Sequence, residues 1–317
     1  MNPSLSIVIP FYNVEQYLNE CLDALLETEG IDQTEIILID DGATDKSSQI
    51  ADKYSEEHSN ITVFHKENEG PSASRNKGLH EAHGDYVFYC DADDMVVPEF
   101  FAKIIAHTKT SSDDIILWDA ELKYETVNLL MPKDRGYFAH EGLEKIETTY
   151  TGKELLETQL RKTGDFVATV WLAAYRRQFL IDNKLYFEKG LIHEDELLLP
   201  KIYIAAKSVH YLPEKVYIYR IREGSIMNPG TSDRKRSVDS LMHIYPSLYD
   251  YYDEVLAGEP LLELIEGNLT KRYVRMIYKY RVWRYGYSSQ IDKKRLMRTA
   301  RKLSHKILVL GLNLFVR

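Results

Sequence analysis

Short apolar runs alternate with amphipathic segments along the first 120 residues of the chain. The apolar runs have the length of buried strands, and the segments between them place apolar side chains at intervals of three and four, as in helices with one buried face. The predicted strands are residues 5–10, 35–39, 61–64, 85–90 and 115–118. The predicted helices are residues 14–26, 45–57 and 98–107, and residues 70–82 predict a loop that leads into a helix. Asn13 and Gln16 have the spacing of a reciprocal cap for the first helix. This alternation predicts an α/β fold with a mostly parallel sheet flanked by helices.

The chain beyond residue 120 has a less regular pattern. Residues 166–175 predict a strand that leads into a helix, and residues 209–220 predict two paired strands around Pro213. The acidic segment 193–196 opens an apolar helix pattern. From residue 237 onward the pattern is helical and rich in tyrosine, so we expect a separate C-terminal helical region.

Polar side chains follow three of the predicted strands. Tyr12 and Asn13 follow the first strand, Asp40 and Asp41 follow the second, and the acidic segment 91–94 follows the fourth. The carboxyl ends of neighbouring parallel strands meet at one edge of a sheet, where ligands of α/β proteins bind. The three strand ends therefore predict one binding site.

The acidic segment contains Asp91, Asp93 and Asp94 within four residues. Packing like charges together is unfavourable unless a cation or positive side chains compensate. Hard divalent cations such as Mg²⁺ and Mn²⁺ prefer carboxylate and phosphate oxygens, so this segment predicts a metal site that also holds a diphosphate. The alternative is a solvated turn that caps the helix near Pro98.

Composition is that of an ordinary globular protein, with 44% hydrophobic and 28% charged residues among 317. The two cysteines, Cys21 and Cys90, are too few for a disulfide framework and favour a reducing compartment. The first residues lack the basic start of a signal peptide, and the longest apolar stretch, residues 307–316, is shorter than the ~20 residues that span a bilayer. We therefore expect a cytoplasmic protein.

The net charge of −9 conceals a strong asymmetry. The segment 268–317 holds fourteen Lys or Arg and one acid, and the rest of the chain holds 26 basic and 48 acidic residues. Apolar residues recur at helical spacing from Leu296 to Leu314 with basic residues between them. Such a helix is typical of peripheral contact with an anionic membrane surface, which would be the inner face of the membrane. The pattern is equally typical of a helix that packs on the catalytic domain or on a second subunit. The acidic remainder disfavours nucleic acid as a partner.

Four motifs, in their order and spacing, resemble the family 2 glycosyltransferases of GT-A fold, which is Rossmann-like. They are Ser6-Ile7-Val8-Ile9-Pro10-Phe11-Tyr12-Asn13, Ile39-Asp40-Asp41-Gly42, Asn68-Glu69-Gly70-Pro71-Ser72-Ala73-Ser74-Arg75-Asn76-Lys77-Gly78 and Asp91-Ala92-Asp93-Asp94. The resemblance covers about the first 120 residues. It implies a catalytic domain over residues 1–225, with a nucleotide-binding half (1–120) and an acceptor half (121–225), before the basic helical region (226–317).

The resemblance also implies a site for a UDP-sugar donor. Pro10 and Tyr12 would line the base pocket, and Asp40 would accept a hydrogen bond from a uracil N–H. Gly70 would let the backbone approach the donor, and Arg75 would face the diphosphate. The remaining donor residues are Asp91 and Ala92, with Asp91 on the ribose or on a metal-bound water.

A weaker match at residues 193–196 implies the catalytic base. Such a base takes the proton of the acceptor hydroxyl, and we favour Asp195 over Glu194. For the Mn²⁺ or Mg²⁺ ion the ligands would be Asp93 and Asp91, with His193 as a further candidate. The alternative is that these acidic residues merely favour the start of a helix.

The resemblance therefore implies an inverting, metal-dependent glycosyltransferase that moves a hexose or N-acetylhexosamine from a UDP-sugar to a hydroxyl of a glycan acceptor, either a cell-surface polysaccharide or a glycan on a lipid or protein. A sugar nucleotidyltransferase is a second hypothesis, although the Gly-rich loop of those enzymes is missing after the first strand. A third is a non-catalytic nucleotide-sugar-binding component of a polysaccharide assembly complex, which would need no base. The sugar and the acceptor stay open.

Overall fold

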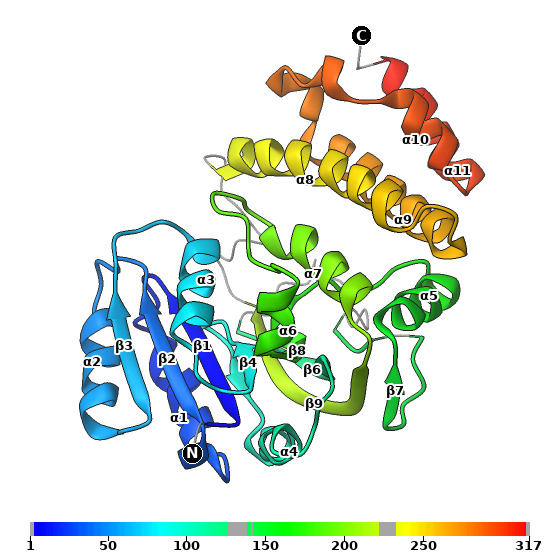
Figure 1. The fold of residues 1–317 in the computed structure, drawn as a ribbon. Coiled ribbons are helices and arrows are strands. Elements are labelled where there is room, and N and C mark those ends of the chain that lie inside the picture. Colours follow the sequence, from blue (N-terminus) through cyan, green and yellow to red (C-terminus); the bar gives the residue numbers. More distant parts are fainter. Residues whose placement is uncertain (1–2, 126–137, 141, 222–232, 315–317) are drawn as a thin grey trace.

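The computed structural model describes residues 3–125, 138–140, 142–221 and 233–314 (Figure 1). Within these ranges one nine-stranded sheet has the order β3-β2-β1-β4-β8-β6-β9-β5, and β7 pairs with β9. The strands are β1 (Leu5–Phe11), β2 (Glu35–Asp40), β3 (Ile61–His65), β4 (Tyr86–Tyr89), β5 (Met95–Val96), β6 (Ile115–Tyr124), β7 (Thr148–Tyr150), β8 (Ala173–Arg176) and β9 (Val209–Ile221). The helices are α1 (Leu18–Leu26), α2 (Ser47–Glu57), α3 (Pro71–Glu81), α4 (Pro98–Thr108), α5 (Gly152–Thr163), α6 (Arg177–Asp182), α7 (Glu194–Ala205), α8 (Asp233–Val255), α9 (Pro260–Tyr280), α10 (Lys293–Thr299) and α11 (Leu303–Gly311).

The N-terminal half of the sheet is parallel, as the alternation of strands and helices predicts. β1 pairs with β2 and β4, and β2 pairs with β3, all in parallel. Phe11 lies beside Asp40 in the register, and Asp40 lies beside His65. The residues of β1, β2 and β4 are almost all buried, with apolar side chains on both faces, which is typical of a sheet covered by helices, whereas the edge strand β3 is mostly half-buried or exposed. The carboxyl ends of these strands therefore meet at one edge.

The second half of the sheet is mixed. β8 is antiparallel to β4 and β6, whereas β6 and β9 are parallel. β9 is a single 13-residue strand, so the prediction of two strands paired around Pro213 is wrong. The register shifts between the pairs Leu117–Tyr211 and Asp119–Lys215, which places Pro213 in a bulge of the strand. Proline has no N–H to donate, and a bulge tolerates it without ending the strand.

The first helix begins later than its apolar pattern predicts, at Leu18. Asn13 has a positive φ of 52° and does not cap this helix. Its side-chain oxygen accepts a hydrogen bond from the backbone N–H of Thr44 at 2.8 Å, across to the loop after β2. The predicted Asn13–Gln16 cap is therefore wrong, because the asparagine instead joins two strand-end loops.

The C-terminal helices form a separate layer over α5 and α7 (Figure 1). α9 packs on α5, α8 packs on α7, and the rings of Tyr245 and Tyr273 stack at 4.8 Å between α8 and α9. The predicted boundary at residue 225 lies outside the described residues. Among the described residues, no helix combines the length and the hydropathy needed to cross a bilayer.

The basic tail consists of two helices, α10 and α11, rather than the one continuous helix that the spacing predicts. The break falls at residues 300–302. Leu296 of α10 and Ala300 are buried, whereas Leu303, Ile307 and Leu310 of α11 are exposed. The apolar stripe therefore divides into a packed part and an exposed part.

Candidate functional site

Asp41 shapes the loop that leads into α3. Its buried carboxylate accepts hydrogen bonds from the backbone N–H groups of Glu69 and Gly70, at 3.0 and 2.8 Å. It also accepts from the Ser74 hydroxyl at 3.1 Å and pairs with the Lys66 ammonium at 2.5 Å. No role of its own is predicted for Asp41 from the sequence, although a second acid directly after a strand end is a signal for one.

Asp40, predicted to read a uracil N–H, lies at the end of β2 with its side chain buried. It accepts hydrogen bonds from the Ala43 N–H at 2.8 Å, the Ser48 hydroxyl at 2.6 Å and His65 Nδ1 at 2.8 Å. Burial alone would raise the pKa of Asp40, but these three donors hold it below its usual value. The Ser48 and His65 contacts fall on Oδ2, so Oδ1 retains acceptor capacity for a ligand.

Pro10 and Tyr12, predicted to line the base pocket, lie at the same sheet edge as Gly70, where the protein backbone is predicted to approach the donor. Pro10 is half-buried, and Tyr12 just after β1 is 47% exposed. Gly70 has a φ of +89°, and a Cβ there would meet nothing within 4 Å. Backbone conformation, and not crowding, is therefore what this position demands of a glycine. The approach of a donor at Gly70 stays a prediction.

Arg75 joins the strand-end acidic segment to the start of α7. Its buried guanidinium donates from Nη2 to Asp91 Oδ1 at 2.9 Å and from Nη1 to Glu194 Oε1. The ring of Phe187 lies 5.3 Å from the guanidinium carbon. Three predicted site residues from distant parts of the sequence thus meet at one point. The diphosphate contact predicted for Arg75 is untested, and its guanidinium serves two carboxylates in this structure.

Asp94 has no predicted role, and in the structure it connects the acidic segment to β9. Its buried carboxylate accepts from the Tyr217 hydroxyl at 2.8 Å and from the Arg220 N–H at 2.7 Å. The Tyr217 oxygen in turn accepts from the Asp91 N–H at 3.2 Å. Burial and the charges of Asp93 and Asp91 raise the pKa of Asp94 well above its usual 3.8.

Arg220, at the end of β9, clamps the same segment. Its Nε donates to the backbone carbonyl of Asp93 at 2.8 Å. Its two terminal nitrogens donate to Glu125 at 2.6 Å and to Glu20 at 2.8 Å. Arg220 lies more than 120 residues after the acidic segment, and only the path of β9 brings the two together. No local pattern in the sequence could have revealed this contact.

The two candidate bases stand in different surroundings at the start of α7. Glu194 is buried and bonded to Arg75. Asp195 is half-buried, and its Oδ1 accepts from the Glu196 N–H at 2.9 Å. Burial and the neighbouring charges of Glu194 and Glu196 raise the pKa of Asp195 well above its usual 3.8. Because Glu194 is engaged in the ion pair with Arg75, Asp195 stays the favoured candidate for proton transfer.

The predicted metal ligands fit a divalent ion only in part. Asp91 and Asp93 are half-buried, and Ala92 between them is buried. His193, with a φ of +66°, has a buried Nε2 atom that lacks a hydrogen-bond partner. In the described part of the chain, these three side chains do not form a group with ligand atoms within 4.8 Å of one another. Mg²⁺ and similar ions are commonly held by one or two carboxylates together with substrate phosphates, so the arrangement fits an ion whose shell a diphosphate completes.

Comparisons with known proteins identify the family of the chain. Residues 6–183 match the sequence profile of glycosyl transferase family 2. The chain is 32% identical over 227 residues to an uncharacterized glycosyltransferase, EpsJ, of Bacillus subtilis, a match that covers 71% of this chain and 63% of EpsJ. It is 31% identical over 237 residues to the cholesterol galactosyltransferase of Borreliella burgdorferi, covering 70% of this chain and 61% of that protein. With glycosyltransferase GlyA of Streptococcus pneumoniae the identity is 30%, covering 71% of this chain and 32% of GlyA.

Solved structures share the fold. Staphylococcus aureus TarS, residues 1–349 in complex with UDP-GlcNAc, superposes with a TM-score of 0.65 at 22% identity, covering 98% of this chain and 80% of that one. The Pyrobaculum calidifontis mannosyltransferase PcManGT, in complex with GDP-Man and Mn²⁺, gives 0.59 at 16% identity, covering 99% and 88%. The chain spans between about a third and two thirds of the length of the three relatives above. On the family match and the identities, the chain belongs to glycosyl transferase family 2.

Proposed function

We propose that this chain is an inverting glycosyltransferase that moves a hexose or N-acetylhexosamine from a UDP-sugar to a hydroxyl of a glycan acceptor. The observation that carries the proposal is the Arg75 bridge between Asp91 and Glu194. It draws the strand-end acidic segment and the start of α7 into one site. This contact supports a reacting centre that the nucleotide half shares with the candidate base.

The chain's own residues account for the chemical step. Asp195 takes the proton of the acceptor hydroxyl as that oxygen bonds to the anomeric carbon and the bond from this carbon to the diphosphate breaks. One base and one displacement give inversion. Asp91 and Asp93, with His193, are the residues that would hold Mn²⁺ or Mg²⁺. When bound, such an ion neutralises the charge that grows on the nucleoside diphosphate.

A panel of UDP-sugars incubated with the chain and Mn²⁺ tests this function. We expect slow hydrolysis of one donor, and no hydrolysis of any donor would contradict an active transferase. Asp195→Asn should lower turnover by about 10²- to 10⁴-fold while UDP affinity stays unchanged. Unchanged turnover would remove Asp195 as the base and favour a non-catalytic sugar-nucleotide sensor. Asp32→Asn, an exposed carboxylate far from the site in sequence, is the matched control.

We further propose that α11 attaches the chain to an anionic membrane surface, where a lipid-linked acceptor would lie. Leu303, Ile307 and Leu310 are 74%, 58% and 56% exposed, which argues against packing on the catalytic domain. A cavity of about 650 Å³ lies beside the helix. Its lining includes Arg275 and Lys302, together with Arg161, Lys271 and Arg301, which pair with carboxylates of the chain, and His305. Apolar side chains next to clustered positive charge fit anionic lipid, and binding to vesicles tests this attachment.

A further inference from the structure

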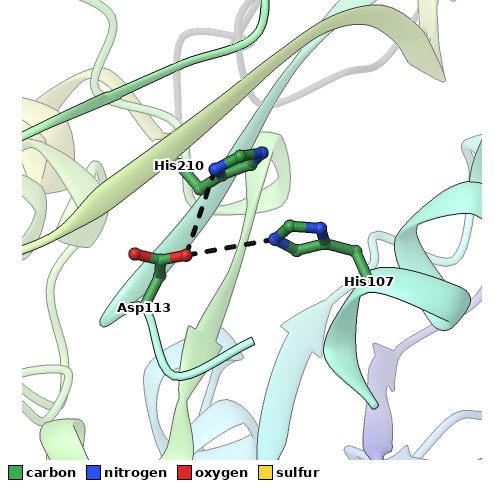
Figure 2. A group of neighbouring side chains, drawn as sticks. All are labelled: His107, Asp113 and His210. Atoms are coloured by element: carbon green, nitrogen blue, oxygen red, sulfur yellow. Dashed lines mark ion pairs between the residues drawn. The ribbon is translucent and has the colours of Figure 1, made fainter. Parts of the chain in front are cut away.

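Two histidines and an aspartate from three segments meet in one cluster (Figure 2). His107 lies in the last turn of α4, Asp113 precedes β6, and His210 is near the start of β9. Asp113 Oδ2 lies 3.9 Å from His107 Nε2 and 4.0 Å from His210 Nδ1. The two imidazole rings stack at 4.3 Å, with their planes 25° apart. One ligand atom from each residue lies within 4.8 Å of the other two.

The histidine nitrogens that face Asp113 have a weak partner or none, whereas Asp113 Oδ2 accepts a hydrogen bond from the Ser111 hydroxyl at 2.9 Å and keeps acceptor capacity for an ion. The Nε2 atom of His107 is buried and has no hydrogen-bond partner. Glu147 lies 3.0 Å from Nε2 of His210, and the Thr149 hydroxyl lies 3.2 Å from its Nδ1. A carboxylate on the outer nitrogen of a histidine fixes the tautomer in which the other nitrogen is a ligand. This arrangement makes Nδ1 the ligand atom of His210, where a metal would displace the weaker Thr149 contact.

The cluster is separate from the donor site. The Asp113 carbonyl accepts a hydrogen bond from the hydroxyl of Tyr86, at the first residue of β4, at 2.7 Å. Asp91 follows the other end of that strand. His210 lies beside Ile116 near the start of β6, so the cluster lies at the amino ends of these strands. Nothing in the proposed transfer reaction uses it.

We propose that His107, Asp113 and His210 bind Zn²⁺ as a structural site that fastens the end of α4 to the start of β9. Two imidazole nitrogens and one carboxylate oxygen are ligands that Zn²⁺ accepts in a tetrahedral shell, with water as the fourth. Ligand atoms around tetrahedral zinc lie about 3.4 Å apart. The present separations of 3.9 and 4.0 Å need to close by about half an ångström. The side chains of His107 and His210 are 25% and 13% exposed, which leaves a path for the ion.

Titration of the chelator-stripped full chain with Zn²⁺ alone, followed by calorimetry, tests the site. The Asp93→Ala background removes the contribution of the donor site. In that background we expect one zinc per chain, and none after His107→Gln is added. Glu147→Gln should weaken zinc binding by about 10- to 100-fold, because it removes the outer partner of His210. His83→Gln is the matched control, since His83 is an exposed histidine that also pairs with a carboxylate, at 3.3 Å.

Equal zinc binding with and without His107→Gln would overturn the proposal and leave the cluster as an ion pair shared by two histidines. Melting of the zinc-free variants shows whether each one folds. If His107→Gln fails to fold, Glu147→Gln decides, because the Glu147 side chain is 63% exposed. Unchanged zinc affinity in Glu147→Gln would then overturn the site. Zinc should also raise the melting temperature of the Asp93→Ala chain and leave that of the double variant unchanged.

Discussion

Arg75 is the residue on which the geometry of the site depends most directly. It donates hydrogen bonds to Asp91, 16 positions away, and to Glu194, 119 positions away. The side chains of Arg75 and Glu194 are buried, and that of Asp91 is 27% exposed. Removing one member of a buried ion pair leaves the other charge without compensation. We predict that Arg75→Gln lowers the free energy of unfolding by about 3–5 kcal/mol, measured by urea denaturation.

The double variant Arg75→Gln/Glu194→Gln is the control for this prediction. It removes the buried charge that Arg75→Gln leaves behind, so its loss should be clearly smaller than the sum of the two single losses. Additive losses would mean that the two side chains do not stabilise one another, and would contradict the bridge.

At the scale of single residues, the sequence predicts several site residues but does not predict the distant side chains that they contact. Asp91, Arg75 and Glu194 follow from motifs, because each stands in a short local pattern. Tyr217 and Arg220 carry no such pattern, and they reach the acidic segment only because β9 runs to it. Pairings between distant segments depend on the fold, and a local spacing cannot encode them.

Among the elements, the contact between α9 and the loop after α5 has a defined electrostatic centre at Asp165. Its carboxylate pairs with Lys271 at 2.8 Å and Arg272 at 2.8 Å, and accepts from the Asn268 amide at 3.0 Å. Burial would raise the pKa of Asp165, but Arg272 and Lys271 hold it below the usual 3.8. The docking of α9 therefore depends on a charged Asp165.

We predict that Asp165→Asn costs about 1 kcal/mol of stability at pH 7, a small figure because the side chain is 35% exposed. A lowered pKa in the folded state gives stability that is present above the unfolded pKa and is lost as pH falls through the folded one. The difference between wild type and Asp165→Asn should thus shrink as pH falls below about 3.8. Thermal melts from pH 7 to pH 2 measure it.

Glu57→Gln is the matched control, since Glu57 forms a surface pair with Lys53 at 3.8 Å. Its effect should stay under about 0.5 kcal/mol. A difference between wild type and Asp165→Asn that does not vary with pH would show that Asp165 acts by packing rather than by charge.

Elements with a buried face were predictable, and irregular ones were not. The strands of the N-terminal half follow from apolar runs because both faces of that sheet are covered. The prediction of two strands in place of β9 is wrong because a proline usually marks the end of a strand. In the structure Pro213 lies in a bulge, and the strand continues past it. The prediction of one continuous helix in the tail is wrong because the helical spacing of apolar residues continues across residues 300–302, where the helix is interrupted. Periodicity reports which side chains share a face and does not report where a helix is interrupted.

Across the whole molecule, some basic side chains of the tail form ion pairs within the chain, and others are exposed to solvent. Part of the positive charge of the tail pairs within the chain, as Arg295 does with Asp250, Asp253 and Glu266. Lys302, which lines the basic cavity, and Lys306 are both exposed. These internal pairs hold α10 on α8 and α9, and the exposed positive charge is left to attract an anionic surface.

Membrane attachment through α11 predicts two separable losses of vesicle binding. Lys302→Gln/Lys306→Gln should weaken binding to anionic vesicles by roughly 30-fold, at about 1 kcal/mol for each charge, and wild-type binding should fall as salt rises. Leu303→Ser/Ile307→Ser/Leu310→Ser should abolish binding without loss of stability, because these side chains are already exposed. Co-sedimentation measures both, with neutral vesicles and Asp32→Asn as controls. If the serine variant keeps its vesicle binding but loses self-association in analytical ultracentrifugation, the exposed face of α11 is an interface with a second subunit, and the membrane proposal fails.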